Sequence, residues 1–436
     1  MRHAWLFATL LLLFFVPAAA APTDMNAIAD RYVRLVLAVG QHDASYVDAY
    51  YGPPEWKADA ESKGKRPLTE LQAEASAALR DLAAVAVPSD EMERLRHDYL
   101  RVQLGAVAAR IKMLQGTRMT FDEESRALYD AVAPTYPASH FEETLANLNA
   151  LVPGPGALAD RVEGFRQHYV IPPAKLDAVF RAAIAECRVR TAAHITLPAD
   201  ERFQLEFVTN TAWSGYNWYQ GHSQSLIQVN TDLPIFIDRA IDLACHEGYP
   251  GHHVYNLLLE QHMVRERGWR EFTVYPLFSP QSLIAEGSAN FGIDVAFPAE
   301  SRVVFERDHL FPLAGLEPAT AAKYYEVLHL LDGLSYAGNE AARRYVDGSF
   351  TASQAADWLV TYTLSSRPRA EQRVRFFEQN RSYVINYNYG KDLVRHFVDA
   401  HGGTSDHPDQ RWKVFSELIS SPRLPSGLQT NPPSSR

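Results

Sequence analysis

The segment ACHEGYPGHHVYNLLLE, residues 244–260, carries the side chains best suited to chemistry in this chain. His246 and Glu247 match the first half of the motif H-E-x-x-H, in which two histidines bind zinc and the glutamate acts as general base. Beside zinc-activated water, such a carboxylate can take the proton and pass it to a leaving amine. Pro250 stands where the second histidine belongs. The pattern predicts a metal site with an altered second half.

His252 and His253 are the two candidates for the second nitrogen ligand. On an undisturbed helix, His252 would point about 120° away from His246 and His253 only about 20° away, so regular geometry favours His253. Pro250 and Gly251 disturb regular geometry, because proline removes a backbone donor and glycine permits unusual dihedral angles. A kink or bulge there would turn His252 toward His246. The local residues leave the choice open.

A third ligand is needed, because a catalytic zinc usually has three protein ligands. The chain has only two cysteines, so the remaining ligand is expected to be a carboxylate. Ser279 and Pro280 begin a predicted helix, SPQSLIAEGSANFGIDVAF, which carries Glu286 in an apolar setting. Glu286 is the candidate.

Polar residues one or two helical turns from these ligands could orient the imidazoles, as zinc sites commonly require. Asp242 precedes His246 by one turn, and Asn290 and Asp294 follow Glu286 by one and two turns. We predict this orienting role for all three.

The pair HEGYPGHH and AEGSANFG resembles the bacterial family called domain of unknown function 885, whose hallmark is H-E-x-x-P-G-H followed by a helix carrying E-G-W-A. That family is grouped with the mostly helical glutamate-zincin metallopeptidases. The resemblance, strongest over about residues 229–390, implies one zinc ion held by His246, His252 and Glu286. It leaves His253 beside the ligands or facing the substrate.

A later segment, RSYVINYNYGKDL, resembles the tyrosine-containing signature of the same family, which ends in Y-x-x-G. The resemblance points to Tyr387, three residues before Gly390, as the donor to the oxyanion of a tetrahedral intermediate. Tyr383 and Tyr389 are the alternatives.

The elements that must position these residues are mainly helices. Residues 22–195 form a predicted helical region with apolar residues at three- and four-residue spacing. Residues 196–402 form the zincin-like catalytic region implied by the resemblance. In it RFQLEFV, WSGYNWYQ and SLIQVN predict a small antiparallel sheet directly before the motif helix. The tail, 403–436, is rich in Pro, Ser and Gly and is expected to be loosely packed from about Ser421.

Bulk properties indicate an exported globular protein. The 436 residues are 47% hydrophobic and 22% charged, and a net charge of −10 without a basic cluster argues against nucleic acid as a partner. Residues 1–21 have a basic start, an apolar core and an A-x-A end, the pattern of a signal peptide. No later stretch predicts a membrane span, so we expect a periplasmic or secreted protein. There Cys187 and Cys245 could pair.

The leading hypothesis is therefore an exported zinc metallopeptidase that acts on a peptide or small amide. Two alternatives remain: a non-catalytic protein that binds peptides or cell-wall fragments, and a zinc hydrolase of non-peptide amides or esters. Ser288, which replaces the tryptophan of the family, favours the first alternative and predicts a wider pocket. A strand edge in WSGYNWYQ or SLIQVN could hold an extended substrate. The sequence decides neither endo- versus exo-cleavage nor the oligomeric state.

Overall fold

The computed structural model describes residues 24–211 and 213–429, and the predicted signal peptide lies outside this range. The architecture is mainly helical, as predicted, with two small sheets where one was expected. The first half of the chain contains α1 (Met25–Gly40), β1 (Val47–Tyr50), α2 (Pro54–Lys63), α3 (Leu68–Ala84), α4 (Glu91–Leu114), α5 (Phe121–Tyr129), α6 (Glu142–Leu151), α7 (Leu158–Gln167) and α8 (Leu176–Ala192).

The second half begins with β2 (Arg202–Val208), β3 (Gly215–Gly221) and β4 (Gln224–Asn230). It continues with α9 (Asp238–Leu243), α10 (His252–Leu259), β5 (Val274–Pro276), α11 (Pro280–Ala296), α12 (Ser301–Phe305), α13 (Phe311–Ala314), α14 (Ala321–Asp332), α15 (Tyr336–Val346), α16 (Ala352–Tyr362), α17 (Arg367–Asn380), α18 (Ile385–Ala400), α19 (Pro408–Ile419) and α20 (Pro425–Leu428).

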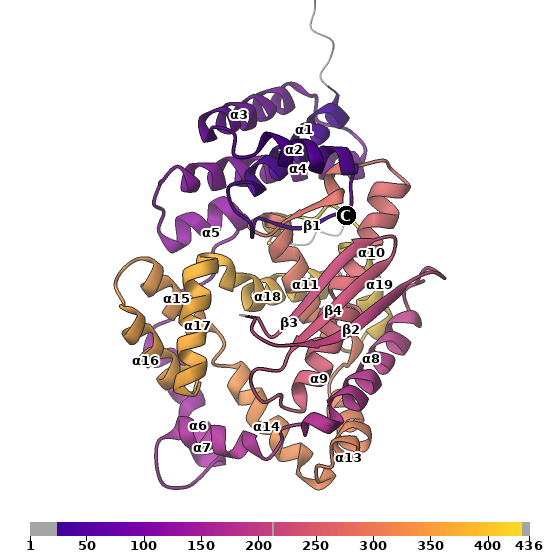
Figure 1. Ribbon diagram of the computed structural model, residues 1–436. Helices are drawn as coiled ribbons and strands as arrows, with labels where there is room; N and C mark the ends of the chain where they lie inside the picture. The colour runs from indigo at the N-terminus through magenta and orange to yellow at the C-terminus, as the bar shows by residue number, and fades with distance from the viewer. Residues whose placement is uncertain (1–23, 212, 430–436) are drawn as a thin grey trace, which may run out of the picture.

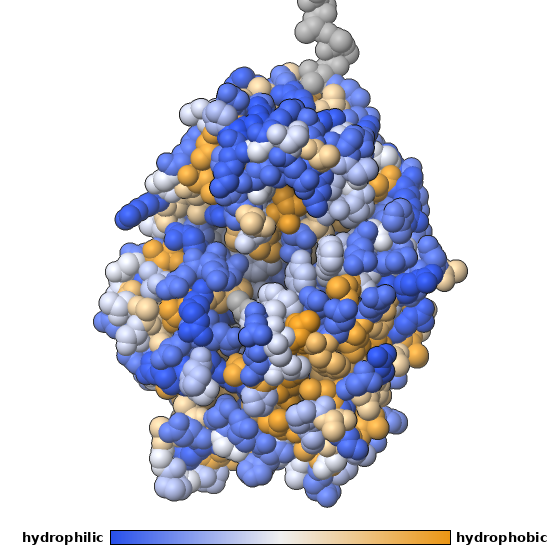
Figure 2. Space-filling model, viewed as in Figure 1, coloured by the Kyte–Doolittle hydropathy of each residue, from blue (hydrophilic) through white to orange (hydrophobic). Residues whose placement is uncertain are grey.

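These elements surround a central hollow. Helices α1–α4 gather at the top of Figure 1, the sheet of β2–β4 lies to the right, and α15–α17 lie to the left. Helices α11 and α18 cross in the middle. The space-filling view of the same face shows the hollow between these groups of elements (Figure 2).

The three predicted strands form one sheet, with the order β2-β4-β3. β3 and β4 are antiparallel, with Gly215 opposite Val229, as expected for two strands joined by a tight turn. β2 runs parallel to β4, with Arg202 opposite Gln224, so the prediction of a wholly antiparallel sheet was wrong. The reason is that β2 joins the far edge of β4 instead of pairing with β3, its neighbour in sequence.

A second, two-stranded sheet joins distant parts of the chain. β1 pairs antiparallel with β5, with Tyr50 opposite Val274. The pairing places the start of the chain beside the segment that leads into α11. The residues of β1 therefore reach the central hollow.

Helix α11 forms the centre of the core. It begins at Pro280 with Ser279 before it, where the sequence predicts a helix start, and nearly all of its residues are buried. A helix that is apolar on every side is expected inside a large protein, where neighbours cover all of its faces. The side chains of α11, Glu286 among them, are therefore held in place by their neighbours.

The C-terminal region is more ordered than expected. Trp412, Phe415 and Leu418 of α19 are buried, and the ring of Phe415 lies 6.1 Å from that of Phe291 in α11. Leu428 of α20 is buried as well. The apolar spacing in RWKVFSELI was enough for a helix, although the surrounding Pro, Ser and Gly obscured it. The expectation of loose packing was therefore wrong up to residue 429.

The two cysteines are in contact. The Sγ atoms of Cys187 in α8 and Cys245 lie 2.8 Å apart, and both side chains are buried, free thiols. Their oxidation to a disulfide stays a prediction.

Candidate metal centre

The motif segment forms a helix interrupted by a widened turn. After α9 the chain makes a π-helical turn, Ala244–Gly248, and α10 begins at His252. The amide of Tyr249 donates to the carbonyl of Ala244, at 3.1 Å, and the amide of Gly251 donates to the carbonyl of Cys245, at 2.9 Å. These bonds span five and six residues instead of four, so the chain is wider here than an α-helix.

Gly251 makes the widened turn possible. A Cβ atom on this residue would lie 1.9 Å from the carbonyl oxygen of His246, so a side chain does not fit. The next residue, His252, is thereby turned toward His246, and the two Nε2 atoms lie 3.1 Å apart. Of the two candidates that regular geometry left open, the structure brings His252 to His246.

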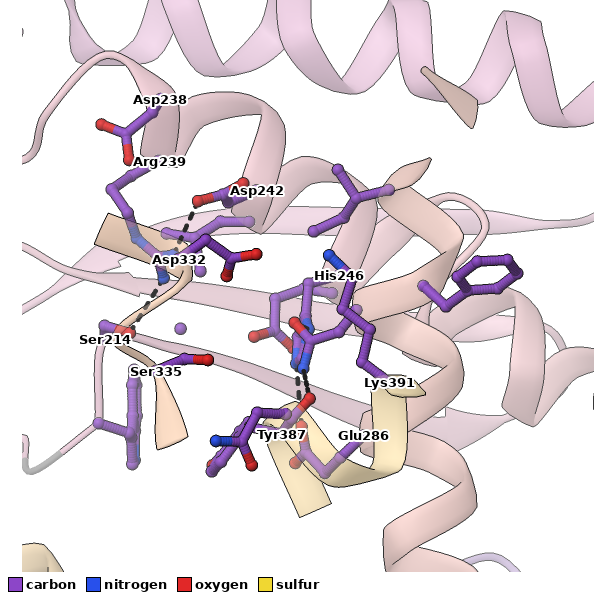
Figure 3. Close-up of a pocket in the computed structure, with 18 of the residues that line it drawn as sticks. Ser214, Asp238, Arg239, Asp242, His246, Glu286, Asp332, Ser335, Tyr387 and Lys391 are labelled. Atoms are coloured by element: carbon purple, nitrogen blue, oxygen red, sulfur yellow. Dashed lines mark hydrogen bonds and ion pairs between the residues drawn. The ribbon is translucent and has the colours of Figure 1, made fainter. Parts of the chain in front are cut away.

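Glu286 approaches the two imidazoles from α11. Its Oε2 atom lies 3.2 Å from Nε2 of His246 and 3.7 Å from Nε2 of His252. The three side chains form a cluster whose potential ligand atoms all lie within 4.8 Å of one another. In Figure 3 dashed lines join His246 to the carboxylate of Glu286, with Tyr387 beside it.

The three donors fit a tetrahedral divalent cation. Zinc–nitrogen and zinc–oxygen bonds of about 2.0–2.1 Å place neighbouring ligands roughly 3.3 Å apart, close to the separations of 3.1, 3.2 and 3.7 Å. Oε2 of Glu286 is buried and accepts no hydrogen bond. A buried carboxylate oxygen that accepts no hydrogen bond is costly, even beside two imidazoles, and a cation between these atoms would satisfy it.

The electrostatics of the cluster also favour a cation. Burial alone would raise the pKa of Glu286, but His252 and His246 hold it well below its usual range. Burial lowers the pKa of His252, whereas Glu286, with Glu247 and Asp48, raises it to about 9. The same negative potential that retains a proton on His252 attracts a divalent cation, which competes with that proton.

Two neighbours fix the orientation of the ligands. Oδ1 of Asn290 lies 3.1 Å from Nδ1 of His246, and its Nδ2 donates to the carbonyl of Tyr387 at 3.0 Å. Because that second bond sets the amide, Oδ1 accepts the proton of Nδ1 and leaves Nε2 of His246 with a lone pair. The hydroxyl of Tyr383 donates to Oε1 of Glu286 at 2.7 Å.

A close helix crossing brings these groups together. A Cβ atom on Gly287 of α11 would lie 2.4 Å from the carbonyl carbon of Gly390 in α18, and one on Gly390 would lie 2.9 Å from the carbonyl oxygen of Leu283. Glycine at both positions lets the two backbones touch. The crossing therefore places Tyr383 and Tyr387 next to Glu286.

Glu247 and Tyr387 face the same cavity as the cluster. Glu247 is buried, and a Cβ on Gly215 of β3 would lie 2.8 Å from its Oε1 atom, so Gly215 provides the space for the carboxylate. Among the described residues, the hydroxyl of Tyr387 has no hydrogen-bond partner. Burial, and then Glu286, raise the pKa of Tyr387 far above its usual range, so this hydroxyl keeps its proton. It is a free donor.

Other predicted positions lie apart from the cluster. His253 is fully buried, with Nδ1 2.8 Å from the hydroxyl oxygen of Ser225 and Nε2 3.0 Å from Oε1 of Glu201. Its role is to join α10 to the sheet, which corrects the expectation that it faces ligands or substrate. Tyr389 does not line the cavity.

The two aspartates that were expected to orient ligands form ion pairs with arginine and lysine side chains instead. Asp242 forms ion pairs with Arg302 at 2.8 Å and with Arg239 at 3.0 Å (Figure 3). Asp294 pairs with Lys391 at 3.1 Å and with Arg395. Helical spacing predicted how far along the helix each aspartate lies from a ligand, but not where its side chain points. These ion pairs correct the expectation that the two aspartates orient ligands. Asn290 alone reaches His246.

Ser288 also lies away from the cavity. Its side chain is buried, and its hydroxyl donates to the carbonyl of Ala285 at 3.1 Å. It is absent from the cavity wall, and the expected widening of the pocket by the loss of the tryptophan stays a prediction.

Sequence reasoning missed Asp48 of β1. The hydroxyl of Tyr216 donates to its Oδ1 at 3.1 Å, and the side chain lines the cavity. Burial, with Glu286 and Glu247, raises the pKa of Asp48 to about 6, although Tyr216 and His252 oppose the shift. No local signal marks this residue, because only the pairing of β1 with β5 brings it to the site.

The cavity that contains the cluster has a volume of about 2060 Å³. Residues 213–217 form part of the cavity wall. Trp213 and Ser214 precede β3, and the other three belong to the start of that strand. β4 is the central strand of its sheet, so of the two segments considered only β3 offers a free edge to a substrate.

No family model matches this chain, and no curated protein matches it in sequence. Solved structures in which the backbone follows a similar path include CHT, with a TM-score of 0.46 and 11% sequence identity. The match covers 91% of this chain and 90% of that one. BsuCP gives a TM-score of 0.45 and 9% identity, covering 90% and 89%. M32 carboxypeptidase from Deinococcus radiodurans R1 gives 0.35 and 11%, covering 88% and 87%.

At these identities and TM-scores, the likeness carries no argument about the chemistry of this chain. The family suggested by its motifs stays a prediction. None of the helices in the described ranges combines the length and apolar character that a membrane span needs.

Proposed function

We propose that the protein is an exported, zinc-dependent hydrolase that cleaves peptide bonds. The observation that carries the proposal is the convergence of His246, His252 and Glu286 around a buried carboxylate oxygen that accepts no hydrogen bond. Glu247 and Tyr387 line the same cavity. Export rests on the pattern of residues 1–21 alone.

In this proposal His246, His252 and Glu286 hold the zinc, while Asn290 and Tyr383 keep two of them in place. A zinc ion there supplies Lewis acidity, which polarises a substrate carbonyl and makes water a stronger acid near neutral pH. All other steps belong to the side chains of the protein.

Glu247 is the proposed general base. Its carboxylate accepts a proton from the attacking water and later transfers it to the leaving amine, so that the amine departs uncharged. Tyr387 is the proposed oxyanion donor, because its free hydroxyl keeps a proton and faces the cavity. The free edge of β3 would pair with an extended substrate through backbone hydrogen bonds.

The test combines metal analysis with hydrolysis of a mixed peptide library. We expect one zinc per chain in the wild type and in Glu247→Gln, and a loss of peptide cleavage of about 100-fold or more in the variant. Glu206→Gln, which changes an exposed glutamate of β2 outside the cavity, is the matched control.

The other outcomes separate the alternatives. Zinc without turnover of any peptide would indicate a binding protein, and turnover confined to non-peptide amides or esters would indicate the other hydrolase. Equal activity of the wild type and Glu247→Gln would show that the base is misassigned.

A further inference from the structure

The cavity wall carries a set of cationic side chains, and most of them are paired with carboxylates. The ion pairs are Arg166 with Asp238, Arg239 and Arg302 with Asp242, Lys391 and Arg395 with Asp294, and Arg411 with Asp399. Arg373 of α17 differs from all of these. Among the described residues, it has neither an ion pair nor a hydrogen bond.

Aromatic rings surround Arg373 instead. Its guanidinium carbon lies 4.6 Å from the ring centre of Phe376 and 5.7 Å from that of Tyr387. A guanidinium that stacks on a ring uses its face and keeps the N–H donors in its plane available to an acceptor. Arg373 therefore presents a free fork of donors in the cavity wall.

An unpaired guanidinium in a cavity wall is suited to binding an anion. The guanidinium stays protonated at any physiological pH, although burial lowers the pKa of Arg373 against the opposing effect of Tyr387. A carboxylate would bind this guanidinium through two parallel N–H···O bonds. Arg369, one turn earlier on α17, also lines the cavity and forms no ion pair with any residue in the described ranges, so its charge adds positive potential.

The position of Arg373 relates it to the reaction. Tyr387, which it touches, lies close enough to Glu286 and Glu247 to be influenced by their charges. A substrate whose carbonyl lies beside Tyr387 therefore has Arg373 next to the same ring. A carboxylate of the same substrate is the group that fits there.

We propose that Arg373 binds the free C-terminal carboxylate of the substrate, so that the protein shortens peptides from their C-terminal end. The proposal rests on the proposed function for the cleavage and names its substrate class. An acidic side chain of the substrate offers the same chemistry, and the test separates the two sources.

Binding to the metal-free protein tests the inference without turnover. Calorimetry would compare N-acetylated tetra-alanine, its C-terminal amide, and an amide of the same length with one internal glutamate. We expect the free acid to bind the wild type about 10- to 100-fold more tightly than the amide, the usual worth of hydrogen bonds to a charged group. Arg373→Ala should lose this preference.

Arg375→Ala is the matched control, because Arg375 is an exposed arginine of the same helix outside the cavity. It should keep the preference for the acid. Arg373→Lys should keep part of it, since lysine retains the charge but not the fork. Arg373→Ala leaves no carboxylate unpaired but removes the contacts with Phe376 and Tyr387, so its melting temperature should fall only slightly.

Equal binding of acid and amide by the wild type, no measurable binding of the acid, or an unchanged preference in Arg373→Ala would each overturn the inference. Tight, Arg373-dependent binding of the glutamate-containing amide would overturn the assignment to the chain terminus. Cleavage by the zinc-loaded protein is scored separately by mass spectrometry. If no peptide is cleaved, the proposed function fails while the binding comparison still decides the role of Arg373.

Discussion

At the scale of single residues, Asn290 connects the two halves of the candidate site. Its side chain accepts from His246, a proposed ligand, and donates to the backbone of Tyr387, the proposed oxyanion donor. One amide thus fixes the tautomer of an imidazole and the position of the segment that carries the tyrosine. Its loss should affect metal binding before it affects the fold.

We expect Asn290→Ala to weaken zinc binding by about 10- to 100-fold, the usual effect of losing a partner that orients a ligand. Competition with a chromophoric chelator measures it. Asp294→Ala, one turn further along α11, should bind zinc as the wild type does, because that carboxylate pairs with Lys391 and Arg395. An equal loss in both variants would mean that Asn290 has no special connection to the ligand.

How far the sequence predicts such residues depends on whether their signal is local. His246, Glu247 and Glu286 belong to contiguous motifs, and the structure places them around one cavity. His252 was favoured only by resemblance, because the π-helical turn that redirects it is a property of the backbone. Asp48 and Arg373 were missed, since they reach the cavity only through long-range packing.

At the scale of elements, the widened turn between α9 and α10 determines the geometry of the cluster. Gly251→Ala should abolish tight zinc binding and lower the free energy of unfolding by about 3 kcal/mol, because the new methyl group would collide with the carbonyl of His246. Zinc titration and urea unfolding measure the two effects. Normal zinc affinity in this variant would contradict the assigned role of the turn.

Gly105→Ala is the control for that experiment. Gly105 lies inside α4, and no atom lies within 4 Å of the place where its Cβ would be. This substitution should raise the free energy of unfolding by about 0.5–1 kcal/mol, as alanine generally does in a helix interior.

A second prediction at this scale concerns the contact between α10 and the sheet. Burial would raise the pKa of Glu201, but His253, Tyr249 and Arg188 lower it to about 2, from an ordinary value of 4.5. A carboxyl whose pKa is lower in the folded state stabilises the protein above about pH 4.5, and that contribution is lost as the pH falls toward 2.

Glu201→Gln should therefore be less stable than the wild type at neutral pH, and the difference should shrink as the pH falls below about 4.5. Thermal unfolding followed by circular dichroism between pH 7 and pH 2.5 measures it. A difference that stays constant over this range would show that the charge of Glu201 is not the source of the stability.

Elements were easier to locate than to pair. Alternation of apolar residues placed β2 at residues 202–208 and β3 and β4 to within two residues, because period and turn residues are local signals. β2 could pair with the free edge of β4 or with that of β3. No residue near β2 in the sequence indicates that it joins β4 in parallel. α19 was missed because the composition of the tail outweighed a short apolar pattern.

At the scale of the whole molecule, the cluster links regions that are far apart in sequence. His246 lies in the π-helical turn and His252 begins α10, while Glu286 belongs to the buried helix α11, against which α18 packs. A shared cation would bind only when these parts have assembled. Metal binding is therefore expected to stabilise the fold as a whole.

We expect removal of zinc with a chelator to lower the melting temperature, and addition of zinc to restore it. At a free zinc concentration of 100 times the dissociation constant, the stabilisation is about 2.7 kcal/mol. Glu286→Gln removes a ligand and should make the melting temperature insensitive to zinc. Scanning calorimetry with and without the metal measures this. Identical melting curves for the two wild-type forms would contradict a bound cation.

The size and enclosure of the cavity also decide which molecules can reach the cluster. The volume of about 2060 Å³ exceeds that of most sites for small molecules, yet the imidazoles of His246 and His252 are only 13% and 14% exposed. We expect a flexible strand to reach side chains that are buried to this extent and a folded domain to be excluded. A hydrolase built this way would digest loose peptides and spare the intact proteins that share its compartment.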